Sequence, residues 1–183
     1  WVVKINNKKY YILDDLISSR DLNKLYIDLT NANCWYLSRH TDGSVIGKWP
    51  GFIVSDKDEL YNQYWFGRFV GLLENIKNNF EKKYKFSLPP KIRRIHVGAK
   101  NNTSNTDFHC DVYEPFTYTI VGFLTPEWGK DWGGELNIEG ELIDFRPGRF
   151  IIFKSDLRHD GAKLKKELDY WKLSLNYVLR ENS

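Results

Sequence analysis

The sequence predicts a mainly β fold in which two helices support an antiparallel sandwich or barrel. The first observation is a series of short apolar runs after residue 91, separated by Gly, Pro and polar turns as in antiparallel sheets. The second is helical spacing of apolar residues, which is confined to the first half of the chain. The third is size: 183 residues, 42% of them hydrophobic and 16% aromatic, suit one domain with a sizeable core.

The first half is predicted to begin with two short strands and a short helix. Residues 2–5 and 10–13 are apolar runs on either side of a polar turn. A helix ending near residues 31–33 is predicted from the spacing of Leu16, Leu22, Leu25, Tyr26 and Leu29. The pair Asp42-Gly43 then predicts a turn, with His40 beside it as an exposed loop residue.

A long helix is predicted next, packed on the outside of the sheet. Ser55 and Asp58 have the spacing of a capping box at its start. Its apolar positions are Leu60, Tyr64, Val70, Leu73, Ile76, Phe80 and Tyr84. A stripe of this kind is typical of a helix that packs against a core. Pro89-Pro90 ends the helical part, so helical support is expected over about residues 14–84.

Short strands are predicted throughout the second half of the chain. They are residues 92–97, 108–112, 117–124, 136–138, 142–145, 150–153 and 171–179. Neither an internal repeat nor a linker is visible in the sequence. The chain is therefore predicted to be one domain over residues 1–183, with its β core at about residues 92–179.

Charge and cysteine content indicate which partners and which cellular location to expect. The chain has 27 basic and 24 acidic side chains, and a net charge of +3 is too small to indicate binding to nucleic acid or membranes. Two cysteines are too few for a disulfide framework, so a reducing, cytoplasmic location is expected. No signal peptide or apolar run of about 20 residues is visible. Because the chain starts at Trp1 rather than Met, we expect the numbering to begin inside a longer chain or after processing.

A metal site is predicted from two segments of the β core. His109 and Asp111 are two residues apart on an expected strand, so both side chains project to one face while Cys110 points away. His159 lies in a polar turn after the strand at 150–153 and is the candidate third ligand. Two histidines and one carboxylate form the facial ligand set of non-heme Fe(II) oxygenases, although zinc with a bound water uses the same ligands.

Several motifs in this half of the chain match a known family in order and spacing. They are His109-x-Asp111, Trp132-Gly133-Gly134-Glu135-Leu136, Pro147-Gly148-Arg149-Phe150-Ile151-Ile152-Phe153, Ser155-Asp156 before His159, and Trp171-Lys172-Leu173-Ser174. Together they resemble the 2-oxoglutarate- and Fe(II)-dependent dioxygenases, and most closely the prolyl 4-hydroxylase-like branch. The resemblance covers about residues 92–179, nearly half of the chain.

This resemblance implies a double-stranded β-helix, the jelly roll of cupin-like proteins. It implies that His109, Asp111 and His159 are the metal ligands and catalytic residues. The expected cofactors are Fe(II), the cosubstrate 2-oxoglutarate and O2, with ascorbate as a further candidate. The implied reaction hydroxylates an unactivated C–H bond and releases succinate and CO2. The expected substrate is a prolyl residue in a peptide or protein, or free proline as an amino-acid substrate.

The resemblance also implies the cosubstrate-binding residues. Lys172 corresponds to the basic residue that binds the distal carboxylate of 2-oxoglutarate, and Ser174 adds a candidate hydrogen bond. Related prolyl hydroxylases commonly have a tyrosine where Phe123 falls, and Thr119 on the same strand face is the candidate substitute. His96 falls near another tyrosine of the family pattern, where it either hydrogen-bonds the ligand or has a structural role. The alternative for Lys172 is a solvent-facing position.

Other functions remain open from sequence alone. Dioxygenases that repair nucleic acids have an Arg-x-Asn-x-Thr-x-Arg pattern in the last strand, whereas this chain has Lys172-x-Ser174-x-Asn176-x-Val178-x-Arg180, so nucleic acid is the weaker candidate partner. A dioxygenase for another small molecule and a non-catalytic, cupin-like metal-binding module are the further alternatives. The polar loop at 100–106 is expected to be a mobile lid, and no membrane partner is expected. The sequence indicates no oligomeric state.

Overall fold

The computed structural model describes residues 8–37, 50–102, 104 and 107–181, and its mainly β architecture confirms the predicted fold class. The strands are β1 (Tyr10–Leu13), β2 (Tyr36–Leu37), β3 (Pro50–Asp56), β4 (Glu59–Leu60), β5 (Lys91–Lys100), β6 (Tyr118–Phe123), β7 (Leu136–Ile138), β8 (Glu141–Ile143), β9 (Phe150–Lys154), β10 (His159–Gly161) and β11 (Lys172–Arg180). The helices of the described part are α1 (Ser19–Thr30) and α2 (Gln63–Tyr84).

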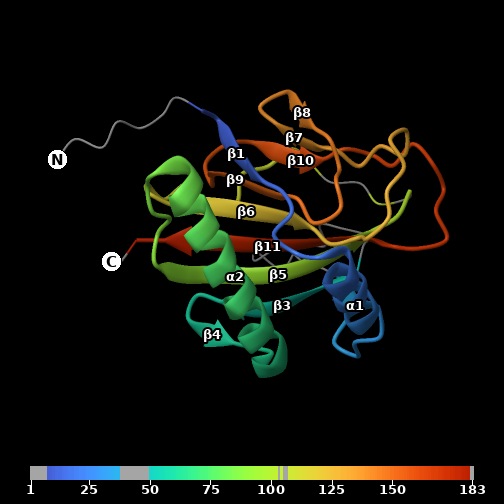
Figure 1. Cartoon of the computed structure of the whole chain (residues 1–183), viewed down its shortest axis with the longest axis horizontal. Coiled ribbons are helices and arrows are strands. Elements are labelled where there is room, and N and C mark those ends of the chain that lie inside the picture. The colour runs from blue at the N-terminus through green and yellow to red at the C-terminus, as the bar shows by residue number, and fades with distance from the viewer. Residues whose placement is uncertain (1–7, 38–49, 103, 105–106, 182–183) are drawn as a thin grey trace.

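Two antiparallel sheets form the jelly roll. The described part of the main sheet has eight strands in the order β1-β9-β6-β11-β5-β3-β2, with β4 added beside β3. A second sheet has the order β10-β7-β8 and lies near the β1-β9 side of the main sheet (Figure 1). Apolar side chains of β7 and β8 pack with those of β6 and β9. The two sheets therefore enclose a core at one end of the main sheet.

The helices cover the opposite face of the main sheet, where α2 crosses in front of the strands (Figure 1). The buried side chains of α2 are Trp65, Phe69, Leu73, Ile76 and Phe80, and they pack against alternate residues of β5 and β11. Burial of this apolar stripe stabilises both the helix and the sheet. Since alternate residues of a strand point to opposite faces, the remaining residues of β5 and β11 face away from this core.

The capping-box prediction at Ser55 is wrong. Ser55 lies in β3, and a tight turn with positive φ at Lys57 (49°) and Asp58 (69°) leads into β4. The helix begins at Gln63 instead, where the side chain of Asn62 accepts a hydrogen bond from the backbone amide of Trp65 at 3.1 Å. Strands β2, β3 and β4 thus divide the expected helical part and extend the main sheet.

The other early elements agree with the sequence patterns where the structure describes them. Residues 10–13 form β1, which pairs with β9, and α1 ends at Thr30 as its spacing predicts. The predicted strand at 2–5 and the turn with His40 lie outside the described residues. In the described part of the chain, neither helix has the length and apolarity needed to cross a bilayer.

We predict that Phe80→Ala lowers the free energy of unfolding by about 3–5 kcal/mol, because its removal leaves a cavity among aromatic side chains. Phe80 is fully buried and contacts the rings of Tyr11, Tyr84 and Phe86. Urea unfolding monitored by circular dichroism measures the change. The control is Ile27→Ala in α1, whose side chain is 49% exposed and whose loss should cost far less. Equal losses in the two variants would contradict this account of the core.

Candidate metal centre and adjoining cationic pocket

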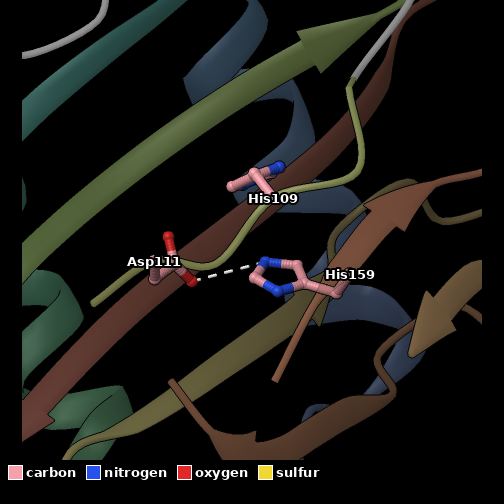
Figure 2. Close-up of side chains that lie close together, drawn as sticks. All are labelled: His109, Asp111 and His159. Atoms are coloured by element: carbon pink, nitrogen blue, oxygen red, sulfur yellow. Dashed lines mark ion pairs between the residues drawn. The ribbon is translucent and has the colours of Figure 1, made fainter. Parts of the chain in front are cut away.

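Three potential metal ligands from two chain segments converge at one end of the fold. His109 and Asp111 lie in the segment between β5 and β6, and His159 is the first residue of β10. One potential ligand atom from each residue lies within 4.8 Å of the others, and the side chains point toward one another (Figure 2). Backbone hydrogen bonds between His109 and His159, at 3.0 and 2.8 Å, hold the two segments together. The structure thus brings together all three predicted ligands.

Both histidines are oriented by backbone carbonyls. Nδ1 of His109 lies 2.7 Å from the carbonyl oxygen of Asp107, and Nδ1 of His159 lies 3.0 Å from that of Leu157. Because a carbonyl oxygen can only accept a hydrogen bond, each Nδ1 must donate, which leaves Nε2, in its unprotonated form, as the nitrogen that can bind a metal. Burial, and then the nearby His159, lower the pKa of His109, which favours its neutral, metal-binding form.

The carboxylate of Asp111 is held in its ionised form. Burial alone raises its pKa, but contacts with His159, Arg94 and Thr119 outweigh burial and place the pKa well below its ordinary value. The hydroxyl of Thr119 donates to Oδ2 at 2.8 Å, and the guanidinium of Arg94 donates to Oδ1. Oδ2 also lies 3.4 Å from Nε2 of His159. This arrangement aims a charged oxygen at the two imidazoles.

The segment that carries the first two ligands is not the strand predicted at residues 108–112. It makes a single bridge to β10 at His109. The backbone amides of Asp111 and Val112 then both donate to the carbonyl of Ser155, at 3.1 and 3.3 Å, so the chain turns rather than extending a ladder. The ligand geometry therefore comes from a turn fixed by hydrogen bonds and not from strand alternation.

A buried lysine, Lys172, lies near β10, the strand that begins with His159, and its surroundings at Gly134, Phe123 and Phe145 are called the cationic pocket. Lys172 is 5% exposed, and its ammonium donates a hydrogen bond to the carbonyl oxygen of Gly134. Its Nζ lies 5.3 Å from the ring centroid of Phe123 and 5.4 Å from that of Phe145. Burial, and then the charge of Lys100, lower the pKa of Lys172 to about 7. The solvent-facing alternative for Lys172 is thereby excluded.

The glycine pair that precedes β7 shapes this pocket. Gly133 and Gly134 have φ of 75° and 78°, as the sequence predicts for a close backbone approach. A Cβ on Gly134 would lie 3.0 Å from the indole of Trp128 and 3.3 Å from Cδ of Lys172. Only glycine at this position lets the carbonyl of residue 134 face the ammonium while the aromatic wall stays closed.

The other predicted ligand-binding residues lie on the same face of the main sheet. The hydroxyl of Thr119 is fully buried and donates to Asp111, so its observed contact is with a candidate metal ligand, and its contact with a cosubstrate stays a prediction. Ser174 is half-buried two residues beyond Lys172 on β11. The half-buried His96 lies on β5 with its ring over Gly51. The roles of Ser174 and His96 in binding also stay predictions.

Two charged residues of the site, Arg94 and Lys100, are missing from the sequence-based prediction. They lie on β5 at even positions, as His96 does, and so they share its face of the sheet. Lys100 is the direct cross-strand partner of Lys172. From residue 94 onward, the alternation along β5 could have identified both residues, because it places the apolar Ile95, Val97 and Ala99 at odd positions and both charged residues at even positions.

The structure describes only part of the predicted lid at 100–106. In the predicted lid, the Ser104 hydroxyl donates to the Asn101 side chain at 3.0 Å and Ser104 is buried, which indicates a turn rather than a free loop; residues 103, 105 and 106 lie outside the described residues. Arg158 packs on Phe108, with the guanidinium carbon 4.6 Å from the ring centroid, at the rim near His109.

The fold has many counterparts among solved structures, although no protein-family model and no curated protein match the chain. It aligns with a prolyl-4-hydroxylase of Pseudomonas putida at 14% identity and a TM-score of 0.68, over 97% of this chain and 95% of that one. It also aligns with an oxidoreductase of the 2OG-Fe(II) oxygenase family from Burkholderia pseudomallei. The identity is 17% and the TM-score 0.68, over 96% of this chain and 87% of that one.

A third similar structure is a prolyl hydroxylase from Trichoplax adhaerens in complex with a peptide fragment of the hypoxia inducible factor oxygen degradation domain. The identity is 12% and the TM-score 0.67, over 97% of this chain and 86% of that one. Likeness at this level of identity is evidence of the fold alone. The chain therefore has the jelly-roll fold of the 2-oxoglutarate- and Fe(II)-dependent oxygenases.

Proposed function

We propose that this protein is a 2-oxoglutarate- and Fe(II)-dependent oxygenase that hydroxylates an unactivated C–H bond. The observation that carries the proposal is the proximity of a two-histidine, one-carboxylate cluster to a buried lysine, in a chain with this fold. The donor set suits Fe(II), because it leaves coordination positions open. Among the described residues no carboxylate pairs with Lys172, so its buried charge favours an anionic ligand.

Each residue has a defined part in this proposal. Fe(II) with 2-oxoglutarate would supply the oxidising chemistry, in which O2 is consumed, succinate and CO2 are released and a C–H bond is hydroxylated. His109, Asp111 and His159 would hold the metal, and Thr119 keeps the carboxylate aimed at it. Lys172 would bind the distal carboxylate of 2-oxoglutarate.

The walls of the pocket support this assignment for Lys172. The stacked rings of Phe123 and Phe145, with centroids 4.3 Å apart, lie beside its ammonium. The indole of Trp128 packs against Phe145 at 4.2 Å. Apolar side chains of this kind lower the local dielectric constant and would therefore strengthen an ion pair between Lys172 and an anionic ligand.

We further propose that the substrate is a prolyl residue in a peptide, or free proline. The fold likeness to prolyl hydroxylases, one of them in complex with a peptide, supports a peptide substrate. Apolar surface is available beside the metal centre, where Tyr113 and Phe116 are 82% and 73% exposed in the segment after Asp111. Activity on another small molecule, or on nucleic acid, is the alternative within this enzyme class.

Succinate formation tests the proposed function. The protein is incubated with Fe(II), 2-oxoglutarate and O2, with and without proline-containing peptides and free proline. Slow succinate release that one of these substrates accelerates is the expected result. Metal binding with no succinate under any of these conditions would instead support a non-catalytic metal-binding module.

We predict that His109→Ala, Asp111→Ala and His159→Ala each abolish detectable Fe(II) binding and turnover without unfolding the protein. Each variant removes one of only three donors. The matched control is Cys110→Ser, which lies between two ligands but hydrogen-bonds to the carbonyl of Asp156 at 3.1 Å. Metal content by mass spectrometry and circular dichroism provide the two readouts. Full metal content in any alanine variant would remove that residue from the site.

We predict that Thr119→Val weakens metal binding by about 10- to 100-fold, because Asp111 loses the hydroxyl that orients it. Valine has nearly the same shape, so the fold should persist. Thr119→Ser keeps a hydroxyl and should restore most of the affinity. Competitive metal titration measures both variants. If Thr119 serves only the packing of β6, Val and Ser will have equal affinities.

We predict that Lys172→Met stabilises the ligand-free protein at pH 7 and weakens 2-oxoglutarate binding. The pKa of Lys172 falls from 10.5 to about 7 on folding, so the unfolded chain binds the proton more strongly. The free-energy cost of burying the charged lysine is therefore largest below about pH 7, and it disappears as the pH rises toward 10.5. The gain in melting temperature should therefore be about 2–4 °C or more at pH 7 and smaller at pH 9.5.

The control for this pH dependence is Lys154→Met, since Lys154 is an exposed residue at the end of β9. Its melting temperature should follow that of the parent protein at both pH values. A loss of stability in Lys172→Met at pH 7 would contradict this prediction, because it would show that other groups of the folded protein already compensate the charge of Lys172.

A further inference from the structure

A second lysine enters the pocket that holds Lys172. Lys100, the last residue of β5, is the cross-strand partner of Lys172 on β11. A Cβ built on Gly161 of β10 would lie 2.8 Å from Nζ of Lys100 and 3.9 Å from Nζ of Lys172. Both ammonium groups therefore converge on the same backbone position, two residues beyond the metal ligand His159.

The protein brings these two like charges together at an energetic cost. Burial lowers the pKa of Lys100 to about 8, and the charge of Lys100 in turn lowers the pKa of Lys172. The nearby carboxylates compensate only in part. Asp160 raises the pKa of Lys100 and Glu135 raises the pKa of Lys172, although Glu135 also forms an ion pair with Lys165 at 3.2 Å. A bound anion between the two lysines would offset this repulsion.

We propose that Lys100 is a second anchor for the distal carboxylate of 2-oxoglutarate, which it binds together with Lys172. This inference rests on the proposed function. A single ammonium is a point charge and cannot make the two-pronged contact that a guanidinium makes with a carboxylate. Two ammonium groups that approach from adjacent strands provide one donor for each carboxylate oxygen.

The surroundings of Lys172 explain why a second cation is useful. The side chain nearest to its ammonium on β6 is Phe123, which offers a ring face and no hydroxyl. The hydroxyl of Thr119, four residues before Phe123 on the same face of β6, donates its hydrogen bond to Asp111. Lys100 supplies the missing donor from the opposite strand. Gly161 leaves room for this ammonium group, because a Cβ at that position would lie 2.8 Å from Nζ of Lys100.

The test compares two 2-oxoacids that differ only in the distal carboxylate. 2-Oxoglutarate and 2-oxobutyrate are titrated anaerobically into protein loaded with Mn(II), and affinity is measured by calorimetry. Lys100→Met should weaken 2-oxoglutarate binding by about 10- to 100-fold and leave 2-oxobutyrate binding unchanged. Lys100→Arg should recover most of the affinity for 2-oxoglutarate.

The matched control is Lys91→Met, since Lys91 is an exposed lysine at the other end of β5 and should behave as the parent protein. Melting curves confirm that each variant is folded. If the parent binds 2-oxoglutarate and Lys100→Met binds it equally well, the role of Lys100 is overturned while the proposed function stands. An equal loss for both 2-oxoacids also overturns it, because the lysine would then not recognise the distal carboxylate. If the parent protein binds neither 2-oxoacid, the proposed function itself fails.

Discussion

The reciprocal backbone hydrogen bonds between His109 and His159 are the interaction on which the site depends. They join a loop between β5 and β6 to the second sheet, and they fix two imidazoles with ring centroids 4.6 Å apart. The carbonyls of Asp107 and Leu157 then set the tautomer of each ring. Because each of these contacts has a backbone group of the protein as a partner, the ligand cluster is preorganised without any ion present.

The two faces of the main sheet have different roles, one in stability and the other in the candidate site. On one face, α2 and alternate residues of β5 and β11 form an apolar core that includes Ile95 and Leu175. On the other face, the intervening residues are charged or polar, among them Arg94, Lys100 and Lys172. Burying these charges costs free energy that the apolar face must offset. A ligand that pairs with the cations would recover part of that cost.

The sequence identifies the local parts of this arrangement better than the non-local ones. The three candidate metal ligands and Lys172 can be found because they lie in short motifs, although the strand expected to carry His109 and Asp111 is in fact a turn. The alternation along β5 indicates the sheet face on which Lys100 lies, but its position opposite Lys172 cannot be recognised without the strand register, which depends on contacts between distant segments. Residues 55–58 suggest a helix cap, yet they form a strand and turn, because pairing of β3 with β5 outweighs the local signal.

The central claim is that the ligand cluster and the cationic pocket form one binding site. The most direct test is an anaerobic titration of 2-oxoglutarate into metal-free protein and into protein loaded with Fe(II). If one ligand bridges both parts, the affinity for 2-oxoglutarate will be at least about tenfold higher in the metal-loaded protein, a coupling of about 1.4 kcal/mol. Equal affinities with and without metal would contradict the claim, because they would show that the lysine pocket and the metal centre act separately.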